Sequence, residues 1–198
     1  SAYAPYADFL IQLNDNEENR KEAIKYYKLA IDAKDDEYAM NKYAYLLEQS
    51  DDFDKYVDEV IYNYKKAIDK GNPNAMYNYG NMLRKGHGIE QNKQEAARYY
   101  QAAIEEDNVD AMHKYANMLR KGDGIEQDQE EAIKLYQRAI EKGNHIKSMK
   151  DYAIMLCEGE GCEVDVNKAL DLLKVAVVNG NASAMNIYAF ELSQIDPE

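Results

Sequence analysis

Two copies of one polar triplet give this chain its clearest capacity for ligand chemistry. Asn81, Arg84 and Lys85 recur 36 residues later as Asn117, Arg120 and Lys121. Asparagine amides can bracket a peptide backbone, and fixed guanidinium or ammonium groups can hold a carboxylate. The pattern predicts a site for an extended or C-terminal acidic peptide, with these candidate binding residues: Asn81, Arg84, Lys85, His113, Asn117, Arg120 and Lys121.

An alternative explanation of the triplets needs no ligand. Each Arg-Lys pair stands where a helix is expected to end, and cations in a last helical turn stabilise the helix dipole. A basic patch is nevertheless unusual in a chain whose formal net charge is −13. Both interpretations stay open at the level of the sequence.

No other residues form a pattern that catalysis requires. His87, His113 and His145 are scattered, without metal-ligand spacing to Cys or Asp. No Ser-His, Cys-His or paired-carboxylate arrangement recurs along the chain. We therefore expect a non-enzymatic protein that uses no metal and no cofactor.

The two cysteines, Cys157 and Cys162, flank a Gly-x-Gly turn. Cys162 stands where Ile89 and Ile125 stand in the neighbouring copies, so a small buried side chain is expected there. A disulfide across the turn needs Cα atoms within about 7 Å, which the spacing permits but does not require. A secreted array would carry a cysteine pair in most repeats. We expect two free thiols in a reducing, cytoplasmic compartment.

The balance of charge disfavours two classes of partner. Lys and Arg total 24 against 37 Asp and Glu, which argues against phosphate backbones and anionic membrane surfaces. No apolar stretch approaches the ~20 residues of a membrane span. A protein or peptide partner is expected, with no nucleic acid and no membrane insertion. The chain opens with Ser1 rather than Met, so it is also expected to be a segment of a longer protein.

An internal repeat supplies the elements that must position these residues. Residues 75–108 and 111–144 match at 21 of 34 aligned positions. In all six copies a small residue directly follows one tyrosine, and a leucine stands four positions after the same tyrosine. This spacing places the tyrosine, the small residue and the leucine on one face of a helix. We call this helix A, and its register tyrosines are Tyr6, Tyr43, Tyr79, Tyr115, Tyr152 and Tyr188.

A second apolar stripe in each repeat predicts another helix, helix B. Its central residues are Tyr27, Tyr64, Tyr100, Tyr136 and Leu173, each flanked by small residues at helical spacing. Side-chain N-caps of helix B are expected at Asn19, Asn92 and Asp128, each with a glutamate three residues later to close a capping box. Left-handed C-caps are expected at Gly71, Gly143 and Gly180, and N-caps of the next helix A at Asn72, Asn108, Asn144 and Asn181. Eleven helices result.

Between helix A and helix B, three copies carry Gly-x-Gly and then an apolar residue, beginning at Gly86, Gly122 and Gly159. A dinucleotide fingerprint would need a preceding strand and a third glycine. The glycines therefore predict turns with positive φ.

These motifs resemble the Sel-one-like repeat family, a branch of the tetratricopeptide-like helical arrays. The resemblance is best over residues 75–184, whereas the copies at 2–38 and 39–74 lack Gly-x-Gly. It implies an all-α, right-handed α/α superhelix whose concave side is lined by helix A. It also implies adaptor work in larger assemblies, for example in signalling or endoplasmic-reticulum quality control. Similar tetratricopeptide arrays hold a peptide's terminal carboxylate with Asn, Lys and Arg of helix A.

The expected architecture is one array of about five helix pairs and a final helix, with repeats at about 2–38, 39–74, 75–110, 111–147 and 148–183 and a half repeat at 184–195. The expected function is a protein–protein interaction scaffold that binds an acidic peptide in the groove of helix A. Rival hypotheses are a scaffold that works through its convex face or its ends, and a disfavoured hydrolytic enzyme. Apolar residues at the two ends, such as Tyr6, Phe9, Ile187 and Phe190, predict either that the chain is a segment of a longer protein or that its ends pair between copies.

Overall fold

The computed structural model describes residues 2–195, and every regular element within that range is an α-helix. The chain divides into two compact units, residues 1–106 and 107–198. The helices of unit 1 are α1 (Tyr3–Leu13), α2 (Glu17–Lys34), α3 (Glu37–Glu48), α4 (Phe53–Asp69), α5 (Pro73–Lys85) and α6 (Lys93–Glu105). Those of unit 2 are α7 (Val109–Lys121), α8 (Gln129–Gly143), α9 (Ile146–Glu158), α10 (Val166–Val178) and α11 (Ala182–Ile195).

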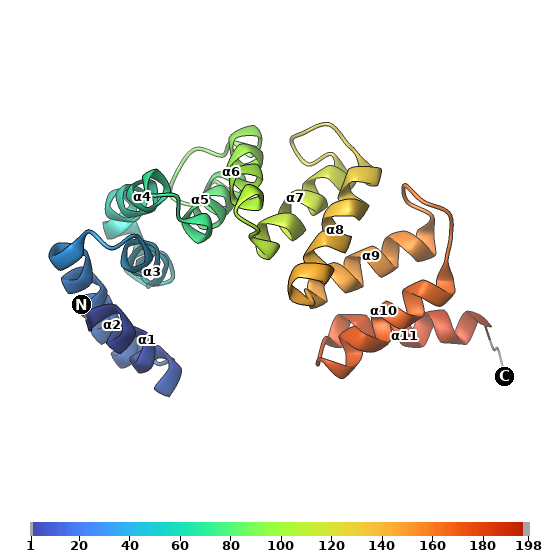
Figure 1. Cartoon of the computed structure of the whole chain (residues 1–198), viewed down its shortest axis with the longest axis horizontal. Helices are drawn as coiled ribbons and strands as arrows, with labels where there is room; N and C mark the ends of the chain where they lie inside the picture. The colour runs from blue at the N-terminus through green and yellow to red at the C-terminus, as the bar shows by residue number, and fades with distance from the viewer. Residues whose placement is uncertain (1, 196–198) are drawn as a thin grey trace. The chain divides into compact units, whose positions relative to one another are not determined.

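The same packing rule applies inside each unit (Figure 1). The odd-numbered helices are helix A and the even-numbered ones helix B. In unit 1, α2 and α4 each contact their own helix A and the helix A of the next repeat. In unit 2, α8 and α10 do the same. The predicted all-α solenoid of five helix pairs and a final helix is confirmed.

The predicted stripes form the core. Each central tyrosine of helix B is at most 1% exposed, and Leu173 takes that place in α10 with no exposure. Small residues on both helices allow this close packing, because helix axes 8–10 Å apart leave little room between them. Gly80 illustrates the fit, since a Cβ added there would lie 2.9 Å from the ring of Tyr100.

Most of the helix-A stripe is buried in the interior copies, but only part of it is buried at the two terminal helices. Tyr6 on α1 is 44% exposed and Leu192 on α11 is 42% exposed, as expected for end helices that no further repeat covers within the described residues. Helices α1 and α11 each pack closely against one neighbour, α2 or α10, whereas α3, α5 and α9 each pack against at least two.

Most predicted helix N-caps are present. The side chains of Asn72, Asn108 and Asn181 accept hydrogen bonds from the backbone N–H three residues later, at 2.8–3.0 Å. Asn92 and Asp128 cap α6 and α8 in the same way. In a capping box, the Glu95 carboxylate would accept a hydrogen bond from the backbone N–H of Asn92. Here Glu95 accepts from the Asn92 side chain instead, and the backbone N–H of Asn92 donates to the Leu83 carbonyl.

Two predicted helix boundaries were wrong. Helix α2 begins one turn before Asn19, with Asn16 as its N-cap, and the Asn19 amide instead donates to the Leu10 and Asn14 carbonyls. Helix α8 continues through Gly143, and Asn144 adopts the left-handed conformation at its end, with φ 46°. His145 then replaces Asn144 as the cap of α9. The extra residue in this repeat shifts both roles by one position.

The Gly-x-Gly connectors are turns, as predicted. Both glycines of each connector have positive φ, between 65° and 79°. The second glycine also lies against the preceding helix B within its unit. A Cβ on Gly88 would lie 2.7 Å from Phe53 of α4, and one on Gly161 would lie 2.6 Å from Gln129 of α8. These connectors therefore join neighbouring repeats as well as the two helices of one repeat.

Candidate functional site

In unit 1, the candidate residues occupy the last two turns of α5. The Asn81 carbonyl oxygen accepts a hydrogen bond of 2.8 Å from the hydroxyl of Tyr100 on α6, which fixes the amide orientation. Arg84 is half-buried and Lys85 is exposed. The backbone carbonyl of Arg84 accepts a bond of 2.9 Å from the Gln91 side chain, so the connector holds the end of the helix in place.

In unit 2, the equivalent residues occupy the end of α7. The Asn117 amide donates to the His113 carbonyl at 2.9 Å. The Arg120 guanidinium pairs with Glu160, and its second nitrogen lies 3.3 Å from a carboxylate oxygen of Glu158. Lys121 is exposed. The structure thus brings these residues to one end of α7, with the arginine already facing carboxylates.

The charge state of Arg120 follows from those carboxylates. Its side chain is only 12% exposed, and burial by itself would lower its pKa. The ion pairs with Glu160 and Glu158 outweigh burial and raise the pKa of Arg120 above its ordinary value. The guanidinium is therefore a permanent cation that is held in a fixed place.

His113 lies beneath Asn117 in the interior of unit 2. Its ring is buried between α7 and α9, with Nε2 at 2.8 Å from Asp151. Burial, which outweighs the hydrogen bond to Asp151, lowers the pKa of His113. Burial opposes ionisation of Asp151, but hydrogen bonds to His113 and Lys150 prevail and hold its pKa at about 2. His113 therefore supports the site from below and is not part of its surface.

Sequence reasoning missed the contacts that join neighbouring repeats at this position. Five residues after the register tyrosine stand Glu48 on α3 and Arg120 on α7. Glu48 accepts from the Tyr64 hydroxyl at 2.7 Å and lies 3.4 Å from His87, the middle residue of the next Gly-x-Gly connector. Arg120 pairs with Glu160, the middle residue of its own next connector. A signal was present in the opposite charges of Arg120 and Glu160, which stand about one repeat apart in the sequence.

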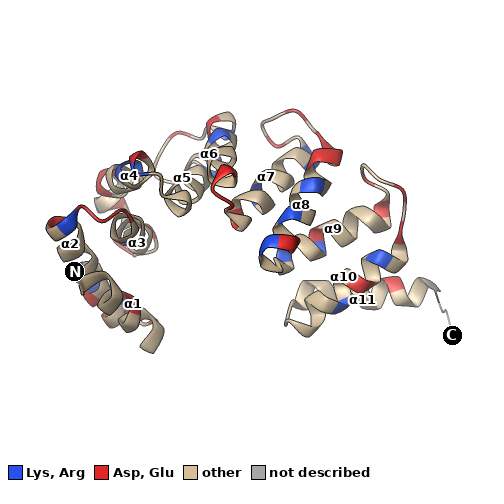
Figure 2. Ribbon diagram, in the orientation of Figure 1, with Lys and Arg blue, Asp and Glu red and all other residues tan. Residues whose placement is uncertain are grey.

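Acidic residues concentrate in the connectors. Figure 2 shows them along the segments that precede α8 and α10, where Glu126, Asp128, Glu163 and Asp165 stand. In unit 2, the Arg120 guanidinium therefore lies among carboxylates of the same fold. Any acidic ligand must compete with these internal partners.

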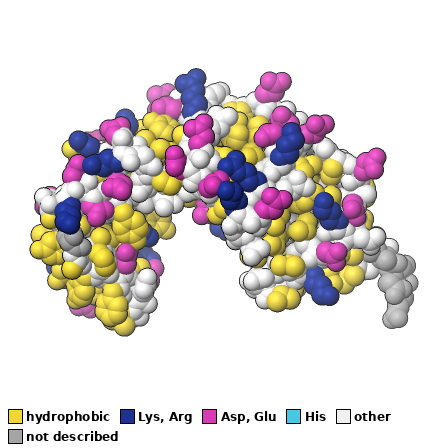
Figure 3. Space-filling model, in the orientation of Figure 1, with side chains coloured by type: hydrophobic (Ala, Val, Ile, Leu, Met, Phe, Trp, Pro, Cys, Tyr) yellow, Lys and Arg dark blue, Asp and Glu magenta, His cyan; other side chains and the backbone are white. Residues whose placement is uncertain are grey.

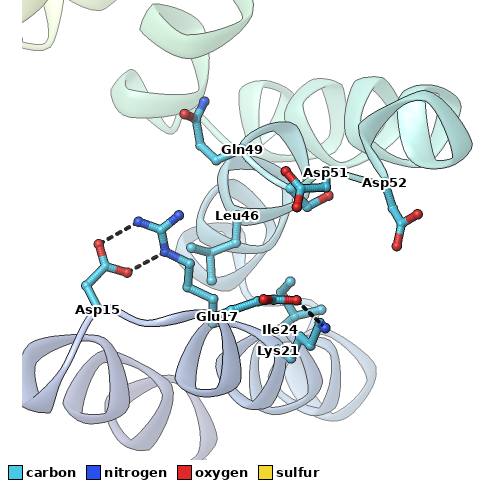
Figure 4. A pocket seen from close by; sticks show the side chains of 10 residues that line it. Asp15, Glu17, Lys21, Ile24, Leu46, Gln49, Asp51 and Asp52 are labelled. Carbon is cyan, nitrogen blue, oxygen red and sulfur yellow. Dashed lines mark hydrogen bonds and ion pairs between the residues drawn. The ribbon is translucent and has the colours of Figure 1, made fainter.

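The short connectors of the first two repeats leave a polar cavity in unit 1. It has a volume of about 340 Å³ and lies between the start of α2 and residues 49–52 (Figure 4). Arg20 forms a two-bond ion pair with Asp15, and Lys21 pairs with Glu17. The cations of this cavity therefore already have carboxylate partners from the same fold.

Both cysteines are free thiols. Cys162 is half-buried, less buried than the sequence predicted, and its sulfur lies 3.8 Å from the Met155 carbonyl. Cys157 lies on the A-helix surface of unit 2 and is also half-buried.

In the part of the chain that the structure describes, no group of three or more His, Cys, Asp or Glu residues is arranged to hold a metal ion. None of the helices in that part is both long and apolar enough to cross a membrane.

The repeats match a family model. The model for the Sel1 repeat matches residues 15–35, 37–72, 73–108, 109–144 and 146–178, well over half of the chain. No curated protein sequence matches the chain.

Solved structures show the same fold. A Sel1 repeat protein from Oxalobacter formigenes superposes with a TM-score of 0.78 at 27% identity, over 92% of this chain and 74% of that one. A protective antigen of uropathogenic Escherichia coli with an SLR fold gives a TM-score of 0.78 at 21% identity, over 86% of this chain and 36% of its own. Proteins built from Sel1 repeats are generally non-enzymatic protein–protein interaction scaffolds. On the five matched repeats and the shared helical architecture, this chain belongs to the Sel1 repeat family.

Proposed function

We propose that this protein is a non-enzymatic scaffold whose A-helix surface binds an extended acidic peptide or an acidic C-terminus. Each unit offers its own set of peptide contacts: Asn81, Arg84 and Lys85 in unit 1, and Asn117, Arg120 and Lys121 in unit 2, with His113 supporting Asn117 from beneath.

The observation that carries the proposal is the environment of Arg120. Its guanidinium already faces carboxylates, and the contact with Glu158 is long, at 3.3 Å, with a Glu158 side chain that is 57% exposed. A ligand carboxylate can replace Glu158 and leave no buried charge unpaired, because the released glutamate returns to water. Exchange of one carboxylate for another is thus less costly than creating a new buried ion pair.

The residues beside the two triplets differ between the units. In unit 1, α3 precedes the basic end of α5 with Tyr45, Glu48 and Gln49. In unit 2, the basic end of α7 is followed on α9 by Ile154 and Cys157. Asn41 of α3 is buried and accepts a 2.9 Å hydrogen bond from the Asn78 side chain, so it contributes to packing.

Charge reversal tests the proposal. A fluorescein-labelled pool of acidic nonapeptides with free C-termini serves as the probe, and fluorescence anisotropy as the measurement. The combined Arg84→Glu and Arg120→Glu variant should bind at least tenfold more weakly, which corresponds to a loss of roughly 1.4 kcal/mol or more in binding free energy. Binding by the unchanged protein should weaken with added salt, because exposed charges are screened.

A matched control separates the site from net charge. Lys25 and Lys134 are exposed residues of B helices in the two units, and reversing both changes the net charge by the same amount. Because Arg120 is half-buried, a second variant, Lys85→Glu with Lys121→Glu, tests the same surface at exposed positions. Equal losses in the control and the site variants would leave only a general charge effect and refute the proposed site.

A further inference from the structure

The A-helix surface of unit 2 contains an apolar cavity separate from the basic end of α7. It has a volume of about 360 Å³ and lies between α9 and α11, both of which pack on α10 (Figure 1). Its lining residues are Ile154, Cys157, Glu158, Asn186, Ile187, Phe190 and Glu191. Ligand pockets span roughly 300–1,000 Å³, so this cavity suits a single large side chain.

The floor of the cavity is hydrophobic. Ile154 and Ile187 are half-buried, and Phe190 is 60% exposed, an unusual position for a phenylalanine. Burial, together with the nearby charges of Glu191 and Glu158, raises the pKa of the Cys157 thiol to about 11. The sulfur is therefore a neutral, apolar atom at physiological pH.

The charge at the edge of the cavity is negative. Glu158 and Glu191 are its ionisable carboxylates, and none of its lining residues is Lys or Arg. Glu158 also lies 3.3 Å from Arg120, whose closer partner is Glu160. A bound group with its own carboxylate would be repelled here, whereas an ammonium or guanidinium group would be attracted.

We propose that the α9–α11 cavity holds a large apolar side chain of a peptide partner and that an adjacent Lys or Arg of the same peptide pairs with Glu158 or Glu191. This site goes beyond the acidic-peptide function, because it selects the opposite charge. A second copy of this chain is a poorer occupant than a basic peptide, because the site selects a cation and each copy carries a net charge of −13.

Disulfide capture at Cys157 tests the proposed chemistry. The two probes are symmetrical disulfides whose halves carry a phenyl ring and either an ammonium or a carboxylate group. The Cys157 thiolate attacks one sulfur, the mixed disulfide forms, and the probe's other half leaves as a thiol, so no external oxidant is needed. Exchange is brought to equilibrium with a fixed concentration of 2-mercaptoethanol, and intact-mass spectrometry measures the captured fraction.

Cys162 provides the matched control for the attraction of cations to an acidic protein. Capture at Cys157 is measured in a Cys162→Ser variant, and capture at Cys162 in a Cys157→Ser variant. The preference is the captured fraction of the ammonium probe divided by that of the carboxylate probe, and it should be at least threefold larger at Cys157 than at Cys162. In a Glu158→Gln, Glu191→Gln variant, the preference at Cys157 should fall to the Cys162 value. The Phe190→Ser substitution should reduce capture of both probes at Cys157.

Three outcomes would overturn the proposal: equal preferences at the two cysteines, a preference unchanged by the glutamine substitutions, or no capture at Cys157. Capture that declines as protein concentration rises would identify a second copy as the occupant and would also overturn it. Binding of acidic peptides is measured in a separate assay with variants of Arg84 and Arg120. A negative result for one site therefore does not affect the interpretation of the other.

Discussion

At the scale of single residues, the helix-B tyrosines link the core to the A-helix surface. The hydroxyls of Tyr27, Tyr64 and Tyr100 donate to polar side chains of their own helix A, at 2.5–2.8 Å. The hydroxyl of Tyr136 is buried and has no hydrogen-bond partner among the described residues. The buried tyrosine of helix B therefore adds a hydrogen bond to its hydrophobic packing in three repeats, whereas in the fourth repeat its hydroxyl is unsatisfied.

This difference predicts opposite effects for one substitution. Tyr64→Phe removes a bond to the Glu48 carboxylate and should destabilise the protein by about 1.5–3 kcal/mol. Tyr136→Phe removes only an unsatisfied hydroxyl and should cost less than about 0.5 kcal/mol, or stabilise the protein. Urea unfolding of both variants gives the comparison. Equal destabilisation would mean that the Tyr136 hydroxyl has a partner in solution.

A second residue-scale prediction concerns pH. Burial lowers the pKa of His113 below 6.5, so the unfolded chain binds more protons than the folded protein in the window between the two pKa values. The contribution of His113 to the free energy of unfolding should therefore be fully present above pH 6.5 and fall as the pH drops through that window. Asp151, with a pKa of about 2 against 3.8 for the free group, adds a loss only below pH 3.8.

Urea unfolding between about pH 7.5 and 4.5 measures the effect. His113→Gln keeps a polar side chain and cannot titrate, so the loss of stability across this range should be smaller in the variant. The comparison with the unchanged protein accounts for His145, whose ring lies 5.0 Å from His113, and for Lys114 and Lys150 nearby. An identical pH profile in both proteins would rule out the assignment.

The candidate site could be predicted only in part from the sequence. The recurrence of Asn81, Arg84 and Lys85 was visible because it follows the repeat. The burial of His113 and the contact of Arg120 with Glu160 were not, because the partners come from the following repeat, about 40 residues away. Local periodicity places a side chain on a helix face but does not reveal which charge lies across from it.

At the scale of elements, the helices were predictable because apolar periodicity and cap residues agree along most of the chain. The failures at Asn19 and Gly143 have a common physical origin. An extra turn in α2 and an extra residue before α9 change which residue meets the helix end. Side-chain chemistry identifies the residues that can cap a helix, and the length of the chain between two helices decides which of these residues becomes the cap.

The connector glycines yield a prediction at this scale. Gly122 has a φ of 65°, so alanine there should destabilise the protein by roughly 1–2 kcal/mol. Gly143 lies within α8, and alanine there should stabilise by up to about 1 kcal/mol, reduced by a 3.3 Å contact with Val109. Thermal unfolding of the two variants measures the difference. A larger loss for Gly143→Ala would contradict the assigned helix boundary.

At the scale of the whole molecule, stability is expected to be local. Within each unit, helices contact mainly their sequence neighbours, as in other repeat arrays. Leu173→Ala empties a fully buried position of α10 and should cost about 2–5 kcal/mol. Hydrogen exchange should accelerate in α9–α11 and stay unchanged in α1–α4. Uniform acceleration along the chain would indicate one cooperative unit instead.

Self-association through the ends stays a prediction. Figure 3 shows hydrophobic side chains gathered over α1 and α2, where Tyr3, Tyr6, Phe9 and Leu13 are exposed. Light scattering over a range of concentrations should detect association that weakens when Tyr6 and Phe9 become serine. A mass that corresponds to one chain at every concentration would exclude it.

Photo-crosslinking shows whether partners bind on the A helices. An acidic nonapeptide with a photoreactive residue is bound to the protein and irradiated, and its attachment sites are mapped by mass spectrometry. We expect crosslinks to α5 and α7 that disappear with excess unlabelled peptide and in the Lys85→Glu, Lys121→Glu variant. Competed crosslinks confined to the B helices or to the terminal helices α1 and α11 would contradict this expectation.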